Sequence, residues 1–175
     1  MSKPKLPTIT VADIRGWEPC YDPTKYVAKD WQGTALDVLR VNECPAEDRL
    51  WVVLREDCID ARTLRLFAVW CARRALAQLD NPDPHSVNAC DVAERYANGE
   101  ATLKELAAAR AAAWAAASAA ASAAARDAAW AAAWAAASAV ARDVARDAAR
   151  AVWDAEYTAQ VKHLIEMLEA EYEQA

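Results

Sequence analysis

The side chains that most often carry out catalysis are sparse in this sequence. Histidine occurs only at His85 and His163, and the five cysteines show none of the closely spaced pairs that zinc sites use. The sequence contains no Walker loop, dinucleotide fingerprint, nucleophile elbow or His-Glu metal helix. We therefore predict a protein that acts by binding and is not an enzyme, and we expect no metal or other cofactor.

Binding chemistry is better represented, because tryptophan and arginine recur along the chain. An indole ring offers an apolar face that also attracts cations, and a guanidinium binds carboxylates or phosphates. The aromatic residues near the N-terminus either pin that segment to the helical core or form a ligand cage. The arginines after residue 125 either form a solvated stripe or bind an acidic partner or a phosphate. The candidate binding residues are Trp17, Trp31, Trp70, Arg73, Arg74, Arg126, Arg142, Arg146 and Arg150.

Composition narrows the class of partner and the location. The net charge of −6 argues against direct nucleic-acid binding, because phosphate affinity depends on concentrated positive charge. The N-terminal residues MSKPKLPTITVAD lack an apolar signal core, and an odd number of cysteines favours a reducing cytosol. The uncharged runs 111–125 and 128–141 are shorter than the roughly 18–20 residues of a membrane span. We expect a cytoplasmic protein without membrane association.

Proline and cap signals divide the chain near residue 33. Four prolines interrupt residues 1–33, which we expect to form an irregular, aromatic-rich lead-in with one short turn, VADIR, capped by Thr10 and ended by Gly16. The remaining residues, 34–175, predict an all-helical domain. The scarcity of glycine, with three in the whole chain, supports an all-α fold because sheets need tight glycine turns.

Cap residues then predict where the first helices of this domain begin. Thr34 can cap ALDVLR, Pro45 suits the first turn of PAEDRLWVVLRED, and Asp60 can cap ARTLRLFAVWCARRALAQL. The run WVVL would also suit a short buried strand, but its flanks favour a helix. Leu50, Trp51, Leu54 and Cys58 follow helical spacing. The helix after Asp60 is apolar around most of its circumference, so we expect it to be central and buried. Its apolar row is Leu64, Ala68, Cys71, Ala75 and Leu79, and Leu66, Phe67, Val69 and Trp70 widen that row.

Further caps lead into an alanine-rich region that we expect to be helical from about residue 103 to 172. Ser86 is expected to cap VNACDVAERYANG, which Gly99 ends, and Thr102 with Glu105 forms a capping box. Alanine occupies 29 of the 45 positions from 107 to 151, and alanine has the highest helix propensity.

The tryptophans of this alanine tract predict how its helices are arranged. Sixteen residues rotate by about 160° around a helix, so Trp114 and Trp130 would lie on opposite faces of one straight rod. Either the tract breaks into helices packed back on one another, which we favour, or partners grip a rod from both sides. The expected break points are Ser118, Ser122 and Ser138, and the tryptophans expected in the core are Trp114, Trp130, Trp134 and Trp153.

Several blocks of the sequence resemble a known family. In chain order between about residues 34 and 155 they are TALDVLR, AEDRLWVVLRED, DARTLRLFAVWCARRAL, and DVAERYANGEAT followed by LAAARAAAWAAA. These blocks resemble a family of Ala/Trp-rich helical immunity proteins found in bacterial toxin-related loci and in phage genomes. The resemblance implies a helical bundle that binds a toxin or defence protein, and it carries over no catalytic residue.

Three functions follow as hypotheses. The leading one is an immunity-like or counter-defence protein that neutralises a toxin or a host defence component by sequestering it. The first alternative is a small-molecule sponge, in which tryptophans and arginines line a pocket for a nucleotide signal. The second alternative is a structural helical protein that self-associates into a homo-oligomer through its alanine faces.

Overall fold

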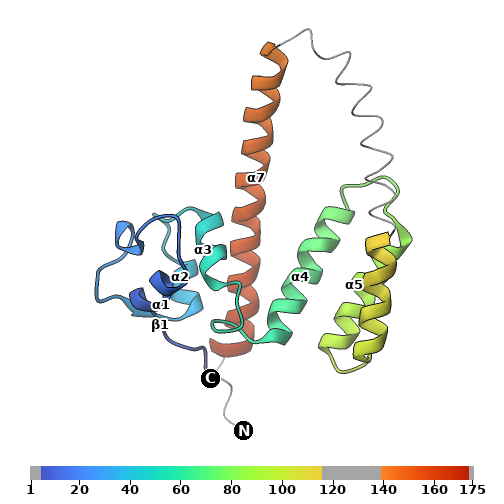
Figure 1. Ribbon diagram of the computed structural model, residues 1–175, viewed down its shortest axis with the longest axis horizontal. Coiled ribbons are helices and arrows are strands. Elements are labelled where there is room, and N and C mark those ends of the chain that lie inside the picture. The colour runs from blue at the N-terminus through green and yellow to red at the C-terminus, as the bar shows by residue number, and fades with distance from the viewer. Residues whose placement is uncertain (1–4, 116–138, 174–175) are drawn as a thin grey trace. The chain divides into compact units, whose positions relative to one another are not determined.

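A computed structural model describes residues 5–115 and 139–173, with side chains described for residues 5–115 and 152–172. The chain divides into two compact units, one formed by residues 1–64 with 151–175 and the other by residues 65–150. Helices dominate both (Figure 1), and the described residues include only one short two-stranded ladder besides. The all-α class predicted from the sequence is confirmed.

The first unit begins with short regular elements. They are β1 (Ile9–Thr10), α1 (Val11–Gly16), the 3₁₀ turn η1 (Pro23–Lys25) and β2 (Gln32–Gly33). The two strands pair antiparallel, with Ile9 opposite Gly33. As predicted, Thr10 caps α1, and Asp13 completes a capping box by accepting the Thr10 amide at 2.8 Å. Residues 1–33 are therefore more regular than their four prolines indicate.

Helices α2 (Ala35–Leu39) and α3 (Ala46–Val53) follow, and α2 packs against α3. Trp51, Val52 and Val53 of the WVVL run are helical, as preferred, but α3 ends at Val53 with Leu54 as its C-cap and does not continue to Cys58. The Arg55 guanidinium donates to the carbonyls of Val52 and Trp51, both at 3.0 Å, which satisfies the end of the helix. Of the four residues at helical spacing, Leu50 and Cys58 are buried, whereas Trp51 and Leu54 are exposed.

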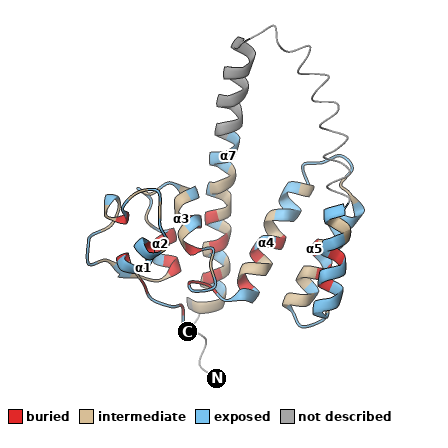
Figure 2. Cartoon of the chain, in the orientation of Figure 1, coloured by how far each residue is buried: buried red, intermediate tan, exposed pale blue. Residues whose placement is uncertain are grey.

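The C-terminal end of α7 (Ala139–Leu168) belongs to the same unit and supplies much of its core. Val161, Leu164 and Leu168 lie at helical spacing and are buried, and Ile165 of the same face is half-buried (Figure 2). The π-helical turn η2 (Glu169–Glu173) then connects to distant parts of the unit. Its links are Arg40 to Glu169 at 2.8 Å, Thr63 to Glu171 at 3.1 Å and Tyr172 to Asp60 at 2.5 Å.

The second unit contains most of α4 (Ala61–Leu76), α5 (Pro84–Ala97) and a helical segment at 103–115. Asp60 caps α4 as predicted, accepting from the Thr63 amide at 3.0 Å. The predicted cap of α5 is wrong by three residues: Asp83 caps it, and Ser86 donates to the Asp83 carboxylate. Pro84 explains the shift, because proline has no amide hydrogen and suits the first helical position.

Other helix boundaries of this unit were predicted correctly, whereas the burial of α4 was predicted only in part. Gly99 ends α5 with a positive φ of 77°, and Thr102 and Glu105 form the predicted capping box. The prediction of a buried helix is correct at Phe67 and Val69 but wrong at Ala68 and Ala75, which are exposed, and α4 ends at Leu76, before the exposed Leu79. The buried residues of that helix are Thr63, Phe67 and Val69.

The described start of the alanine-rich segment buries Leu106 and Ala109 but leaves Trp114 exposed to solvent. Leu106 and Ala109 pack with Val92 of α5 in the core of this unit. Trp114 is 77% exposed, because eight residues of helix rotate it by about 80° from Leu106. Trp153 is 63% exposed and lies about 12 Å along α7 from Val161, so the core predicted for both tryptophans is wrong. Trp130, Trp134, Ser118, Ser122 and Ser138 lie outside the described residues.

Candidate functional site

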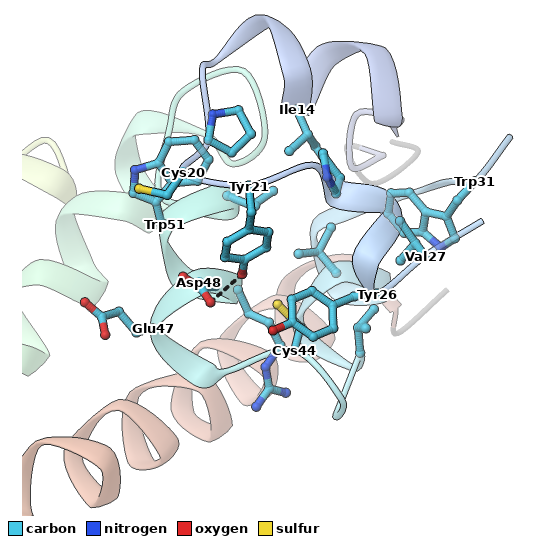
Figure 3. Close-up of a pocket in the computed structure, with 16 residues that line it drawn as sticks. Ile14, Cys20, Tyr21, Tyr26, Val27, Trp31, Cys44, Glu47, Asp48 and Trp51 are labelled. Atoms are coloured by element: carbon cyan, nitrogen blue, oxygen red, sulfur yellow. Dashed lines mark hydrogen bonds between the residues drawn. The ribbon is translucent and has the colours of Figure 1, made fainter. Parts of the chain in front are cut away.

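An aromatic pocket of about 210 Å³ lies within the first unit. Its lining is mostly apolar. The lining residues come from α1, the segment around η1, the residue before β2, and helices α2 and α3 with the loop between them. Figure 3 shows the Tyr21 ring in the middle of this lining, with its hydroxyl directed at Asp48. The aromatic residues of the lining are Tyr21, Tyr26, Trp31 and Trp51. A concave, mostly apolar surface with a few polar groups is typical of a binding site.

Local hydrogen bonds shape the turn that carries the two tyrosines. Asp22 caps η1 by accepting the Thr24 amide at 2.9 Å, and Arg15 of α1 binds the same carboxylate through two nitrogens at 2.9 and 3.0 Å. The rings of Tyr21 and Tyr26, on either side of the turn, then meet edge to face with centroids 5.6 Å apart. The turn therefore presents the tyrosines as one preformed wall.

Gly33 sets the position of the tryptophan wall. A Cβ atom at Gly33 would lie 2.7 Å from Cζ2 of Trp31 and 2.8 Å from Cβ of Asp37. Only glycine leaves room there for the Trp31 ring and for Asp37, which forms the α2 capping box with Thr34. Gly33 therefore permits both the position of the Trp31 ring in the pocket wall and the capping box at the start of α2.

Two polar groups of the lining, the Tyr21 hydroxyl and the Cys44 thiol, are held in their protonated forms. The Tyr21 hydroxyl donates a short hydrogen bond to Asp48 (Figure 3), and burial together with this bond raises the pKa of Tyr21 far above its ordinary value. Burial also raises the pKa of the Cys44 thiol. A protonated phenol and thiol are poor nucleophiles, so these groups suit packing and hydrogen bonding better than catalysis.

The lining carries charges of both signs, from Glu47, Asp48 and Arg49. Within the described part of the chain, neither Glu47 nor Asp48 forms an ion pair. Arg49 also lines the pocket, but its guanidinium donates to the Leu39 carbonyl at 2.6 Å. Lys25 places its Nζ 4.8 Å from the Tyr21 ring centroid, on an exposed side chain. The pocket therefore combines aromatic walls with charges of both signs, and Lys25 also interacts electrostatically with Asp48.

A tryptophan–arginine cluster continues from the pocket onto the surface. The Arg55 guanidinium carbon lies 4.2 Å from the Trp17 ring centroid and 4.8 Å from that of Trp51, so two indoles sandwich it. Trp51 belongs both to this cluster and to the pocket lining, and it is 41% exposed. We call Trp17, Arg55 and Trp51 the indole clamp.

The structure places two of the predicted binding residues at this site. Trp31 lines the pocket, and Trp17 belongs to the indole clamp. Of the N-terminal aromatic residues considered for a ligand cage, Tyr21, Tyr26 and Trp31 line the pocket together with Trp51, and Trp17 does not. Sequence reasoning missed the carboxylates Glu47 and Asp48, whose only signal was their position in the first turn of α3.

Three other predicted residues lie in the second unit, where their contacts are structural. Trp70 stacks on Phe67 with centroids 6.2 Å apart, and the Arg74 guanidinium lies 5.0 Å from the Trp70 ring centroid. Arg73 joins α4 to α5 through ion pairs with Asp91 at 2.9 Å and Glu94 at 2.6 Å.

The arginine row falls beyond the described side chains. Arg126 lies outside the described residues, and Arg142, Arg146 and Arg150 lie on α7 where only the backbone is described. Among the described residues, no three His, Cys, Asp or Glu side chains gather as a metal site requires. No helix in residues 5–115 or 139–173 has the length and apolar character to cross a bilayer.

Comparisons with known proteins add no relative. No family model, curated protein sequence or solved structure matches this chain.

Proposed function

We propose that this protein acts by binding a protein partner, as an immunity or counter-defence protein that neutralises a toxin or a defence component by sequestration. The observation that supports the proposal most strongly is that the aromatic pocket opens beside the indole clamp and shares Trp51 with it. Tryptophan, tyrosine and arginine are the side chains that most often dominate the energy of protein interfaces. A preformed pocket beside rigid rings also lowers the entropic cost of binding.

The size of the cavity favours a protein partner over a sponge for nucleotide signals. The cavity of about 210 Å³ is smaller than the roughly 300–1,000 Å³ of pockets that enclose drug-sized ligands, so it suits one side chain of a partner. The raised pKa values of Tyr21 and Cys44 favour binding over nucleophilic chemistry.

Paired tryptophan variants test the proposal. Candidate toxins and defence proteins are titrated against the full chain, against Trp51→Ala, and against Trp114→Ala as a control that removes an exposed indole from the other unit. Loss of an interface hot spot costs about 2 kcal/mol or more, so Trp51→Ala is expected to weaken the partner's binding at least about 30-fold. Trp114→Ala is expected to bind normally. Failure of every candidate to bind, or equal losses in both variants, would contradict the proposal.

A further inference from the structure

Most of the surface that the pocket leaves open is apolar, although polar side chains contribute to its lining. The Tyr21 hydroxyl donates to Asp48 and also hydrogen-bonds the Cys44 thiol. Arg49 donates to the Leu39 carbonyl at 2.6 Å, and its Nε, which has no acceptor among the described residues, is buried out of reach of an occupant. Because these groups are engaged or buried within the chain, a polar occupant would lose its hydrogen bonds to water and gain few in return.

The charges around the pocket balance one another. Glu47 and Asp48 bring two negative charges, while Arg49 of the lining and the nearby Lys25, which interacts with Asp48, bring two positive ones. Lys25 and Arg55 also lie over three of the four rings of the lining, within 5 Å of their centroids. Neither an anion nor a further cation therefore has a charge to complement here, and a neutral occupant is favoured.

The size and the walls of the pocket indicate which neutral group it takes. An apolar cavity of roughly 150 Å³ is enough to bind benzene, so a cavity of about 210 Å³ has room for one phenyl or indole group. Aromatic rings favour edge-to-face or offset packing against one another, as Tyr21 and Tyr26 already show at 5.6 Å. Trp51 belongs to both the lining and the indole clamp, so a ring in the pocket would continue the surface proposed for the partner.

We infer that the pocket receives one neutral aromatic side chain of the protein partner, a phenylalanine or a tryptophan. Its ring packs against the aromatic walls, and its backbone stays at the open side of the pocket. Burial of a large ring in a preformed pocket is also the arrangement typical of an interface hot spot. The inference rests on the proposed function and specifies what that function recognises.

Capped amino acids test this inference without the partner. N-acetyl-phenylalanine amide, N-acetyl-glutamine amide and N-acetyl-arginine amide are titrated into the full chain and followed by NMR of the tryptophan indole signals. The phenylalanine probe is expected to bind at least about tenfold more tightly than either polar probe, which is the lower end of the effect of burying a large apolar side chain.

Three variants locate the binding of the phenylalanine probe. Val41→Phe, which fills the pocket from a half-buried position of the lining, is expected to remove most of that binding. Cys20→Trp adds a ring at an exposed position of the lining, where core packing is left intact, and is expected to weaken it too. Val152→Phe, at a position that is 66% exposed and outside the lining, is expected to leave it unchanged.

Each outcome bears on the inference separately from the proposed function. Equal binding of the three probes, or phenylalanine binding that survives in both lining variants, would overturn the aromatic occupant even if Trp51→Ala still weakens partner binding. Tighter binding of toluene, which carries the same ring without a backbone, than of the capped phenylalanine would overturn a side-chain occupant in favour of a small aromatic molecule. A clear phenylalanine preference without any protein partner would support the pocket chemistry and count against the proposed function.

Discussion

Replacing Gly33 by alanine tests how tightly the pocket wall is built. The new Cβ atom would lie 2.7 Å from Trp31 and 2.8 Å from the Cβ atom of Asp37, closer than real Cβ contacts come. Asp37 cannot retreat freely, because its carboxylate accepts the Thr34 amide at 2.7 Å and thereby holds the start of α2. Overpacking costs about 1–3 kcal/mol, and loss of the cap adds about 1 kcal/mol. We expect Gly33→Ala to lower the free energy of unfolding by about 2–4 kcal/mol.

The other two glycines provide matched controls for this substitution. A Cβ atom at Gly16 meets nothing within 4 Å, so Gly16→Ala is expected to change stability by less than about 0.5 kcal/mol. Gly99 has open space but a φ of 77°, so Gly99→Ala is expected to cost about 1 kcal/mol through backbone strain alone. Urea denaturation followed by circular dichroism and tryptophan fluorescence measures all three. A Gly33→Ala variant as stable as Gly16→Ala would refute the packing described for Trp31 and Asp37.

Three further predictions concern helix caps and burial. Hydrogen bonds at helix starts lower the pKa of Asp37 and of Asp83. The stabilisation that these two carboxylates contribute is therefore present above the ordinary carboxylate pKa and is lost as pH falls through the lowered value. The urea midpoint at pH 7 is expected to exceed that at pH 3. Asp83→Ala is expected to cost about 1 kcal/mol in urea denaturation and Ser86→Ala less, because the Ser86 amide can still donate; equal costs would contradict the cap assignment. Leu164→Ala, at a fully buried position, is expected to cost about 2–5 kcal/mol, whereas Trp153→Ala at an exposed one is expected to change thermal stability little.

Helix starts were the part of this fold that the sequence predicted best. Thr10, Thr34, Asp60 and Thr102 all cap the helices expected of them, because a cap depends on residues within one turn. The one wrong cap had a local explanation too, since Pro84 favours the first helical position and places Asp83 before it.

Burial and the site were harder to predict, because they depend on contacts between distant residues. The end of α3 is set by Arg55 capping its carbonyls while stacked on Trp17, a contact between segments 38 positions apart that helical spacing cannot reveal. The pocket likewise needs Tyr21 beside Asp48, two residues far apart in the sequence. Aromatic richness near the N-terminus indicated that rings would gather, but it did not indicate which carboxylates they would meet.

The discontinuity of the first unit has a consequence for how the chain acquires its structure during translation. Residues 1–64 cannot complete their packing until Leu164 and Leu168 have been synthesised, because these leucines are fully buried within the same unit. At about 5–20 residues per second, residues 65–150 alone take roughly 4–17 s to emerge. During that time part of the apolar surface of residues 1–64 stays exposed and accessible to chaperones, until the end of α7 has been synthesised and can cover it.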